Sequence, residues 1–63
     1  MRSLVEGLRR ERGLSRRQLA QRADVTEKTV FSYEREGLDR AQLGCLVRVA
    51  RALGVGVGDL FEE

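Results

Sequence analysis

The chain of 63 residues contains no histidine, no proline and no tryptophan, and its only cysteine is Cys45. A lone cysteine excludes an internal disulfide and, without histidine, any cysteine-based zinc cluster. No apolar run approaches the roughly 18 residues that span a membrane, and no signal-peptide pattern opens the sequence. We therefore expect a soluble, cytoplasmic protein that holds neither a metal ion nor another cofactor.

Patterns that carry catalysis are missing as well. The sequence has no Ser–His–Asp set, no spacing of metal ligands and no glycine-rich loop that cradles phosphate. A domain of this size buries only about 60% of its unfolded surface, which leaves little room for a deep substrate pocket. We expect a binding protein that works through an exposed face, and not an enzyme.

The charge of the chain is unevenly distributed. The formal net charge is only +2. Residues 1–35 carry nine basic and five acidic side chains, whereas residues 36–63 carry three basic and five acidic ones. The basic excess in the first half favours a polyanionic partner on one side of the molecule.

Helix signals are dense, and strand signals are nearly absent. The clearest helix start lies between Leu14 and Leu19, where Ser15 and Gln18 can form a capping box and the two leucines can pack together. Similar starts follow at Val25-Thr26, Leu38-Asp39 and Val55-Gly56, with the second residue of each pair as the cap.

The predicted helix ends agree with these starts. Glycine follows a helical stretch at 13, 37 and 54, where it can adopt the left-handed conformation that closes a helix, and Asp24 stands at the corresponding place after the second helix. The predicted helices are 3–12, 15–23, 26–36, 40–53 and 57–62. Since all connections are short, we expect one all-α domain over residues 1–63.

The apolar stripes of these helices predict the core, because each helix can bury its stripe only against the others. The residues at helical spacing are Leu4, Leu8, Leu19, Ala20, Ala23, Val30, Tyr33, Leu43, Leu46, Ala50, Leu53, Val55 and Leu60. Cys45 lies beside this stripe and is interpreted as a small packing residue.

Residues 15–36 form the most informative unit of the sequence. One helix is followed by the three-residue turn Asp24-Val25-Thr26 and then by a second helix, and the small Ala20 lets the two helices cross closely. This is the spacing of a helix-turn-helix, whose second helix presents its amino-terminal end and outer face to a major groove of DNA.

These residues resemble the repressor/Cro-type helix-turn-helix family, also called XRE-like. The matching segments are Leu8-Arg9-Arg10-Glu11-Arg12-Gly13-Leu14-Ser15, Gln18-Leu19-Ala20, Val25-Thr26, Thr29-Val30, Tyr33-Glu34, Leu43, Val49-Ala50-Arg51-Ala52-Leu53-Gly54-Val55 and Asp59-Leu60. The resemblance covers essentially the whole chain and implies a compact five-helix, lambda-repressor-like domain. It also implies a sequence-specific transcriptional regulator, a repressor that binds a palindromic operator in double-stranded DNA as a homodimer.

The predicted DNA contacts divide into two groups. With Val30 and Tyr33 inward on a helical wheel, the third helix points Lys28, Phe31, Ser32 and Arg35 outward. By resemblance, base edges are read by Glu27, Lys28 and Ser32, and Phe31 beside them can pack on a thymine methyl group. The predicted phosphate contacts are Arg16, Arg17, Thr26, Thr29, Arg35 and Arg40, of which Arg16 and Thr26 match positions that commonly hold phosphates in the family.

Other roles for these residues stay open. Glu27 can act only by stabilising the positive end of the helix dipole. Lys28, Ser32, Arg16 and Arg17 can be ordinary solvated surface positions. The resemblance implies that Arg9 and Glu34 form a structural ion pair between the first and third helices. Dimerisation is expected from operator symmetry, with Val57 and Phe61 as the apolar candidates for the interface.

Two departures from the family pattern support an alternative function. Phe31 stands where small polar or charged residues are usual, and the segment 36–40 is more acidic and one residue longer than the usual basic loop. The alternative is a protein-interaction module of the antitoxin or anti-repressor type, in which a regulatory partner protein matters as much as DNA. DNA binding requires Lys28 and Arg16, whereas pure protein binding tolerates their loss.

Overall fold

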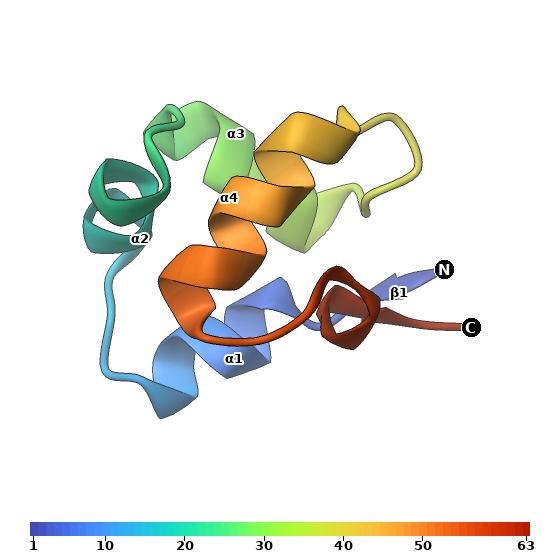
Figure 1. The fold of residues 1–63 in the computed structure, drawn as a ribbon, viewed down its shortest axis with the longest axis horizontal. Helices are drawn as coiled ribbons and strands as arrows, with labels where there is room; N and C mark the ends of the chain where they lie inside the picture. Colours follow the sequence, from blue (N-terminus) through green and yellow to red (C-terminus); the bar gives the residue numbers. More distant parts are fainter.

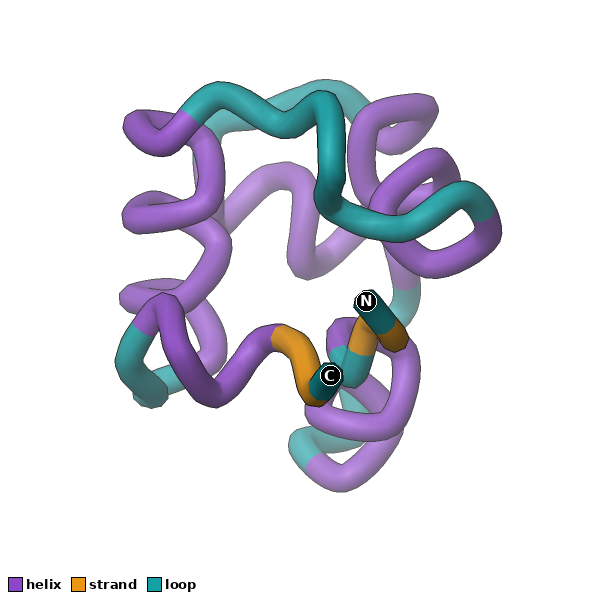
Figure 2. Tube along the Cα trace, turned by 90° about the vertical axis from the view of Figure 1, so that its right-hand side faces the viewer, coloured by secondary structure: helices purple, strands orange, loops and turns teal.

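Four α-helices and one short β-ribbon make up the computed structural model, which describes residues 1–63. The helices are α1 (Val5–Glu11), α2 (Arg16–Ala23), α3 (Glu27–Arg35) and α4 (Leu43–Leu53), followed by a single 3-10 turn, η1 (Val57–Leu60). Strands β1 (Arg2–Ser3) and β2 (Phe61–Glu62) pair antiparallel, so that the two ends of the chain lie side by side (Figure 1 and Figure 2). None of the helices is long and apolar enough to cross a membrane.

The predicted fifth helix is wrong. The segment 57–62 forms one 3-10 turn and then leaves it as a strand, which gives four α-helices in place of five. The ribbon is fixed by contacts between the chain ends: the Leu60 carbonyl accepts a hydrogen bond from the Leu4 amide at 2.7 Å, and Ser3 pairs with Phe61. The same pairing delays the start of α1 from residue 3 to Val5.

The starts predicted for α2 and α3 are confirmed. Ser15 Oγ accepts from the amide of Gln18 at 3.0 Å, and Gln18 Oε1 accepts from the amide of Ser15 at 2.8 Å. Thr26 Oγ1 caps α3 by accepting from the amide of Thr29 at 3.0 Å. Between the two helices Asp24 takes the left-handed conformation, with a φ of 57°. These helices therefore begin and end where short-range hydrogen bonds favour it.

The start predicted for α4 is wrong. Asp39 caps nothing, and the helix begins at Leu43 after an extended Gln42 that makes no side-chain cap bond. The reason lies in the preceding loop, where Leu38 is buried and its carbonyl accepts from the amide of Ala41 at 3.0 Å. This turn occupies the residues that the cap pattern assigned to the first turn of the helix.

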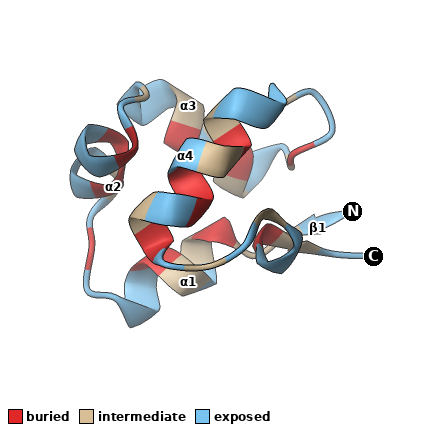
Figure 3. Cartoon of the chain, viewed as in Figure 1, coloured by how far each residue is buried: buried red, intermediate tan, exposed pale blue.

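The core lies where α2 packs against both α4 and α3, and its buried positions are red in Figure 3. Most predicted core residues are buried: Leu19, Ala20, Ala23, Val30, Tyr33, Leu46, Ala50, Leu53 and Leu60. The structure adds four that the stripes did not predict: Val5, Leu14, Leu38 and Val49.

Leu43 is the clearest error in the predicted core, since 68% of it is exposed. It is the first residue of α4, and the buried stripe of that helix begins only at Leu46. Leu4, Leu8 and Val55 are half-buried rather than buried. The buried positions of α1 are instead Val5 and Arg9, one turn apart. Arg9 is buried because its side chain points at the buried carboxylate of Glu34 in α3.

Candidate nucleic-acid interface

The helix-turn-helix consists of α2, the turn at residues 24–26 and α3, which lie together along one side of the molecule (Figure 1). The amide of Val25 donates to the carbonyl of Ala20 at 3.0 Å, and the left-handed Asp24 reverses the chain in the same turn. Ala20 is buried, and its small side chain allows the close helix crossing. The unit therefore holds α3 at a fixed angle with one face outward.

The buried side of α3 determines which residues form its outer face. Val30 and Tyr33 are turned into the core. On the opposite side Glu27, Lys28, Phe31 and Arg35 are exposed, while Ser32 and Thr29 are half-buried. The structure thus brings all four predicted base-reading residues onto one helical face.

The predicted phosphate contacts differ in how free they are. Arg17, Arg35 and Arg40 are exposed, and none of them forms an ion pair or a side-chain hydrogen bond within the protein. The hydroxyls of Thr26 and Thr29 lie 2.8 Å apart at the amino end of α3. Arg16 is different, because its side chain is already engaged.

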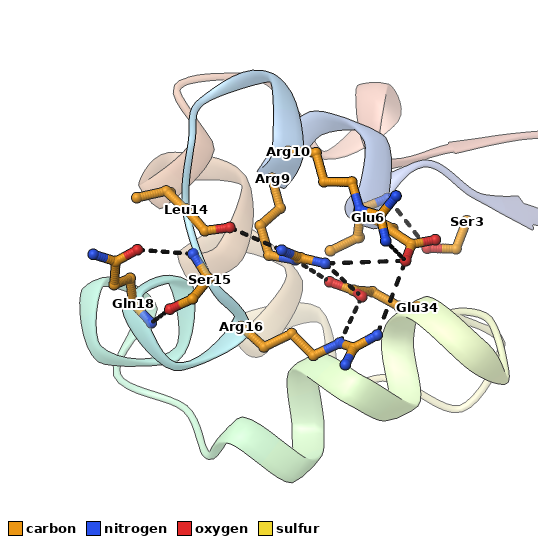
Figure 4. A network of polar contacts seen from close by, with 10 residues as sticks. Ser3, Glu6, Arg9, Arg10, Leu14, Ser15, Arg16, Gln18 and Glu34 are labelled. Carbon is orange, nitrogen blue, oxygen red and sulfur yellow. Dashed lines mark hydrogen bonds and ion pairs between the residues drawn. The ribbon is translucent and has the colours of Figure 1, made fainter.

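A carboxylate from α3 joins the first three helices (Figure 4). Glu34 has a fully buried side chain that accepts from Arg9 Nε at 2.7 Å and from Arg16 Nε at 2.9 Å. Arg9 Nη1 also donates to the carbonyl of Leu14 at 2.8 Å, so this buried arginine fixes the end of α1 as well. Because every buried side-chain nitrogen and oxygen atom has a hydrogen-bond partner, we interpret the cluster as a structural unit.

The two arginines determine the ionisation of Glu34. Burial alone would raise the pKa of this carboxyl, but the hydrogen bonds from Arg9 and Arg16 and their positive charges outweigh it, so that its pKa lies below the ordinary value. The hydrogen bond to Glu34 likewise raises the pKa of the Arg9 guanidinium. Glu34 is therefore a carboxylate at neutral pH and carries no proton for chemistry.

Sequence reasoning missed the position of Arg16. Besides Glu34 it has Glu6 of α1 at 3.9 Å from Nη2, and its Cζ lies 4.9 Å from the centroid of the Phe31 ring. Arg35 lies over the same ring at 5.9 Å. The Phe31–Arg35 contact has an i,i+4 signal in the sequence, but the approach of Arg16 depends on how α2 and α3 cross.

A cleft of about 690 Å³ runs along the other flank of α3, between that helix and the loop before α4. Lys28 and Ser32 line it from the helix, and Arg40 lines it from the loop. Glu36 and Asp39 also line it, so that acidic side chains stand beside the expected phosphate contact of Arg40. The acidic loop noted in the sequence thus borders the proposed interface directly.

The two dimer candidates lie at the opposite end of the domain from the turn of the helix-turn-helix. Val57 in η1 and Phe61 in β2 are both half-buried and pack partly against the core. Each keeps part of its apolar surface exposed.

Fold and outer face together define a helix-turn-helix protein. The sequence model of a family described as helix-turn-helix matches residues 5–60, and the chain belongs to this family. The predicted resemblance to repressor/Cro-type, XRE-like domains is confirmed.

Named relatives agree with this assignment. An uncharacterised HTH-type transcriptional regulator of Rickettsia conorii is 40% identical over 58 residues, which cover 92% of this chain and 46% of the relative. The chain thus spans less than half the length of the curated relatives it matches.

Several solved structures share the fold, and two of them illustrate the similarity to this chain. One is the N-terminal DNA-binding domain of the master biofilm regulator SinR from Bacillus subtilis, with 30% identity, a TM-score of 0.88 and coverage of 100% of this chain and 93% of that one. The other is a complex of the SinR and SinI proteins, with 30% identity, a TM-score of 0.84 and coverage of 94% of this chain and 57% of the matched chain.

Proposed function

We propose that this chain is the DNA-binding domain of a transcriptional regulator, and that it acts as a repressor by placing α3 in the major groove of a palindromic operator. The observation that carries the proposal is the outer face of α3, where Lys28 and Glu27 are exposed at the amino end and Ser32 follows one turn later. Two exposed arginines that make no ion pair or hydrogen bond within the protein accompany this face, Arg35 on α3 and Arg40 in the loop before α4. Similarity over the whole chain to a domain described as DNA-binding supports this function.

Each side chain has a base edge that suits it. Lys28 can donate to O6 and N7 of guanine, Glu27 can accept from N4 of cytosine, and the Ser32 hydroxyl can pair with several bases. Sequence-independent affinity comes from the phosphate contacts of Arg17, Arg40 and the amino end of α3, which position the helix without reading sequence.

Two copies of the domain account for a palindromic site. A two-fold dimer places its two α3 helices in successive major grooves, about 10 bp apart along one face of the duplex. Val57 and Phe61 supply apolar surface for the contact between copies.

Selection from random duplex DNA tests the proposal, followed by anisotropy titrations of the enriched duplex. We expect a palindromic consensus and a loss of its recognition in Lys28→Ala, since a good base contact is worth about 1–3 kcal/mol, or roughly 5- to 150-fold in affinity. Arg17→Ala is the matched phosphate variant, and it weakens binding to all duplexes alike. Arg51→Ala, on an exposed part of α4, is the control that leaves binding unchanged.

The second candidate is a protein-interaction module. It is favoured by the exposed apolar side chains of Phe31 and Leu43, at 46% and 68%, and by the acidic side chains that line the cleft beside α3. The SinR–SinI complex, in which a domain similar to this chain makes up 57% of the matched chain, is an example of a protein with this fold that has a protein partner. No enrichment from the random pool and no binding to duplex DNA at low salt would favour this candidate over the first.

A further inference from the structure

Phe31 is the aromatic side chain on the outer face of α3, and two arginines lie over its ring. Cζ of Arg16 is 4.9 Å and Cζ of Arg35 is 5.9 Å from the ring centroid. A guanidinium group within about 6 Å of an aromatic face is attracted by the negative potential of the ring. Phe31 therefore draws together two cations that belong to different helices.

Both arginines keep donors that the protein does not use. Nε of Arg16 donates to Glu34 and Nη2 lies near Glu6, but Nη1 has no partner within the protein. Arg35 is exposed and makes no ion pair or hydrogen bond within the protein. Since a guanidinium presents five N–H donors in a rigid fork, each arginine can still donate to an anion.

We propose that Phe31 is a positioning residue, which holds Arg16 and Arg35 to grip the phosphate backbone beside the groove that α3 enters, and that it does not read a base itself. This inference rests on the proposed DNA-binding function. Phosphate oxygens match the guanidinium fork. Arginines held by the ring in the free protein lose less side-chain freedom on binding than unrestrained ones.

The arrangement around Phe31 argues against its predicted role at a thymine methyl group. Two guanidinium groups already cover part of the ring. Arg16 is also tied to the buried Glu34, so it cannot leave the ring without breaking an ion pair at 2.9 Å. A polyanion suits this surface better than an apolar group.

Two substitutions separate the ring's charge attraction from its size. Phe31→Leu keeps an apolar side chain and loses the aromatic face, whereas Phe31→Trp keeps the face. Affinity is measured by anisotropy, at several salt concentrations, for the duplex enriched by selection and for a duplex of scrambled sequence.

We expect Phe31→Leu to weaken binding to both duplexes by a similar factor, about fivefold. The slope of log K against log salt should become shallower by about one to two, because one or two phosphate contacts, and the counterions that they release, are lost. Phe31→Trp should restore both quantities. A purely structural role of Phe31 would not change the salt slope. Urea unfolding of each variant is the control that tests whether the fold is kept.

A double-mutant cycle tests the coupling to Arg35. If Phe31 acts through the arginines, Phe31→Leu costs less in the Arg35→Gln background than in the wild type. Equal costs in the two backgrounds would overturn the inference.

The remaining outcomes are distinct. If Phe31→Leu keeps the affinity and the salt slope of the wild type, the inference is wrong but the proposed function stands. The same holds if Phe31→Leu loses affinity only for the selected duplex, because that is the signature of base reading. A wild-type protein that binds neither duplex would overturn the proposed function, and this inference with it.

Discussion

Glu34 shows how one buried side chain can hold three helices in place. Its carboxylate has no exposed surface, and it receives hydrogen bonds from Arg9 of α1 and Arg16 of α2. A charge in such a position is tolerated only while its partners remain, since removal of one partner leaves another charge uncompensated. This carboxylate therefore ties α3 to α1 and α2, in addition to the packing of Val30 and Tyr33 in the core.

Replacement of Glu34 by glutamine should be strongly destabilising. Arg9 would stay buried with only the more distant Glu6 carboxylate, at 4.0 Å, as a counter-ion, and we expect the free energy of unfolding to fall by about 3 kcal/mol. Urea denaturation at pH 7 measures the change. Glu11→Gln is the control, because Glu11 is exposed and pairs with Arg12 only at the surface, and it should change stability by less than about 0.5 kcal/mol. Equal effects of the two substitutions would contradict this account of the cluster.

The same carboxylate should make stability fall in acid. The folded-state pKa of Glu34 lies below its ordinary value, so its contribution is present above the unfolded-state pKa of about 4.3 and is lost as the pH falls through the lower folded-state pKa. We therefore expect the loss below about pH 4, and a smaller loss in Glu34→Gln. Unfolding free energies from pH 7 to pH 2.5 give the measurement. Parallel curves for the two proteins would assign the acid sensitivity to other groups.

At the scale of the elements, local hydrogen bonding decides what a sequence can predict. The Ser15 capping box and the Thr26 cap involve residues three apart, and both were predicted correctly. Asp39 carries the same pattern, but the burial of Leu38 keeps that segment in a loop. The β-ribbon joins residues about 60 positions apart, so no local signal marks it.

In the candidate site, too, the features that depend on local spacing were predictable and the contacts between helices were not. The outer face of α3 follows from helical spacing once Val30 and Tyr33 are assigned to the core, and the structure places the expected residues there. The contacts of Arg16 with Glu34 and Phe31 depend on the crossing of two helices, which sequence spacing does not determine. The family resemblance supplied the Arg9–Glu34 pair but not the second arginine.

Two glycines in α1 and at its end should respond in opposite ways to alanine. An added Cβ meets nothing within 4 Å at Gly7 or at Gly13, but Gly13 has a φ of +67° whereas Gly7 lies inside the helix. We expect Gly7→Ala to raise the free energy of unfolding by about 0.5–1 kcal/mol and Gly13→Ala to lower it by about 1 kcal/mol. Thermal and urea unfolding of the pair provide the test, and a change of the same sign in both would contradict it.

At the scale of the whole molecule, the two ends of the chain pair with each other (Figure 2). Strand β1 also contacts α3, whereas η1 and β2, which carry Val57 and Phe61, pack against each other and η1 packs against α4. A contact between copies through Val57 and Phe61 would leave both α3 helices free for DNA. We expect Val57→Ser to weaken binding to a full palindrome about tenfold and to leave binding to an isolated half-site unchanged. Sedimentation of the wild type with the palindromic duplex should show two domains on each duplex. One domain per duplex at saturation would exclude the two-fold assembly.

Amide chemical-shift mapping shows whether DNA lies against the outer face of α3. The ¹⁵N-labelled chain is titrated with the selected duplex and with its scrambled counterpart at low salt. We expect the largest shifts on residues 26–32, with further shifts at the start of α2 and in the loop before α4, while η1 and the β-ribbon change little. Largest shifts at the ribbon end of the domain, or none at all on saturation with DNA, would contradict it.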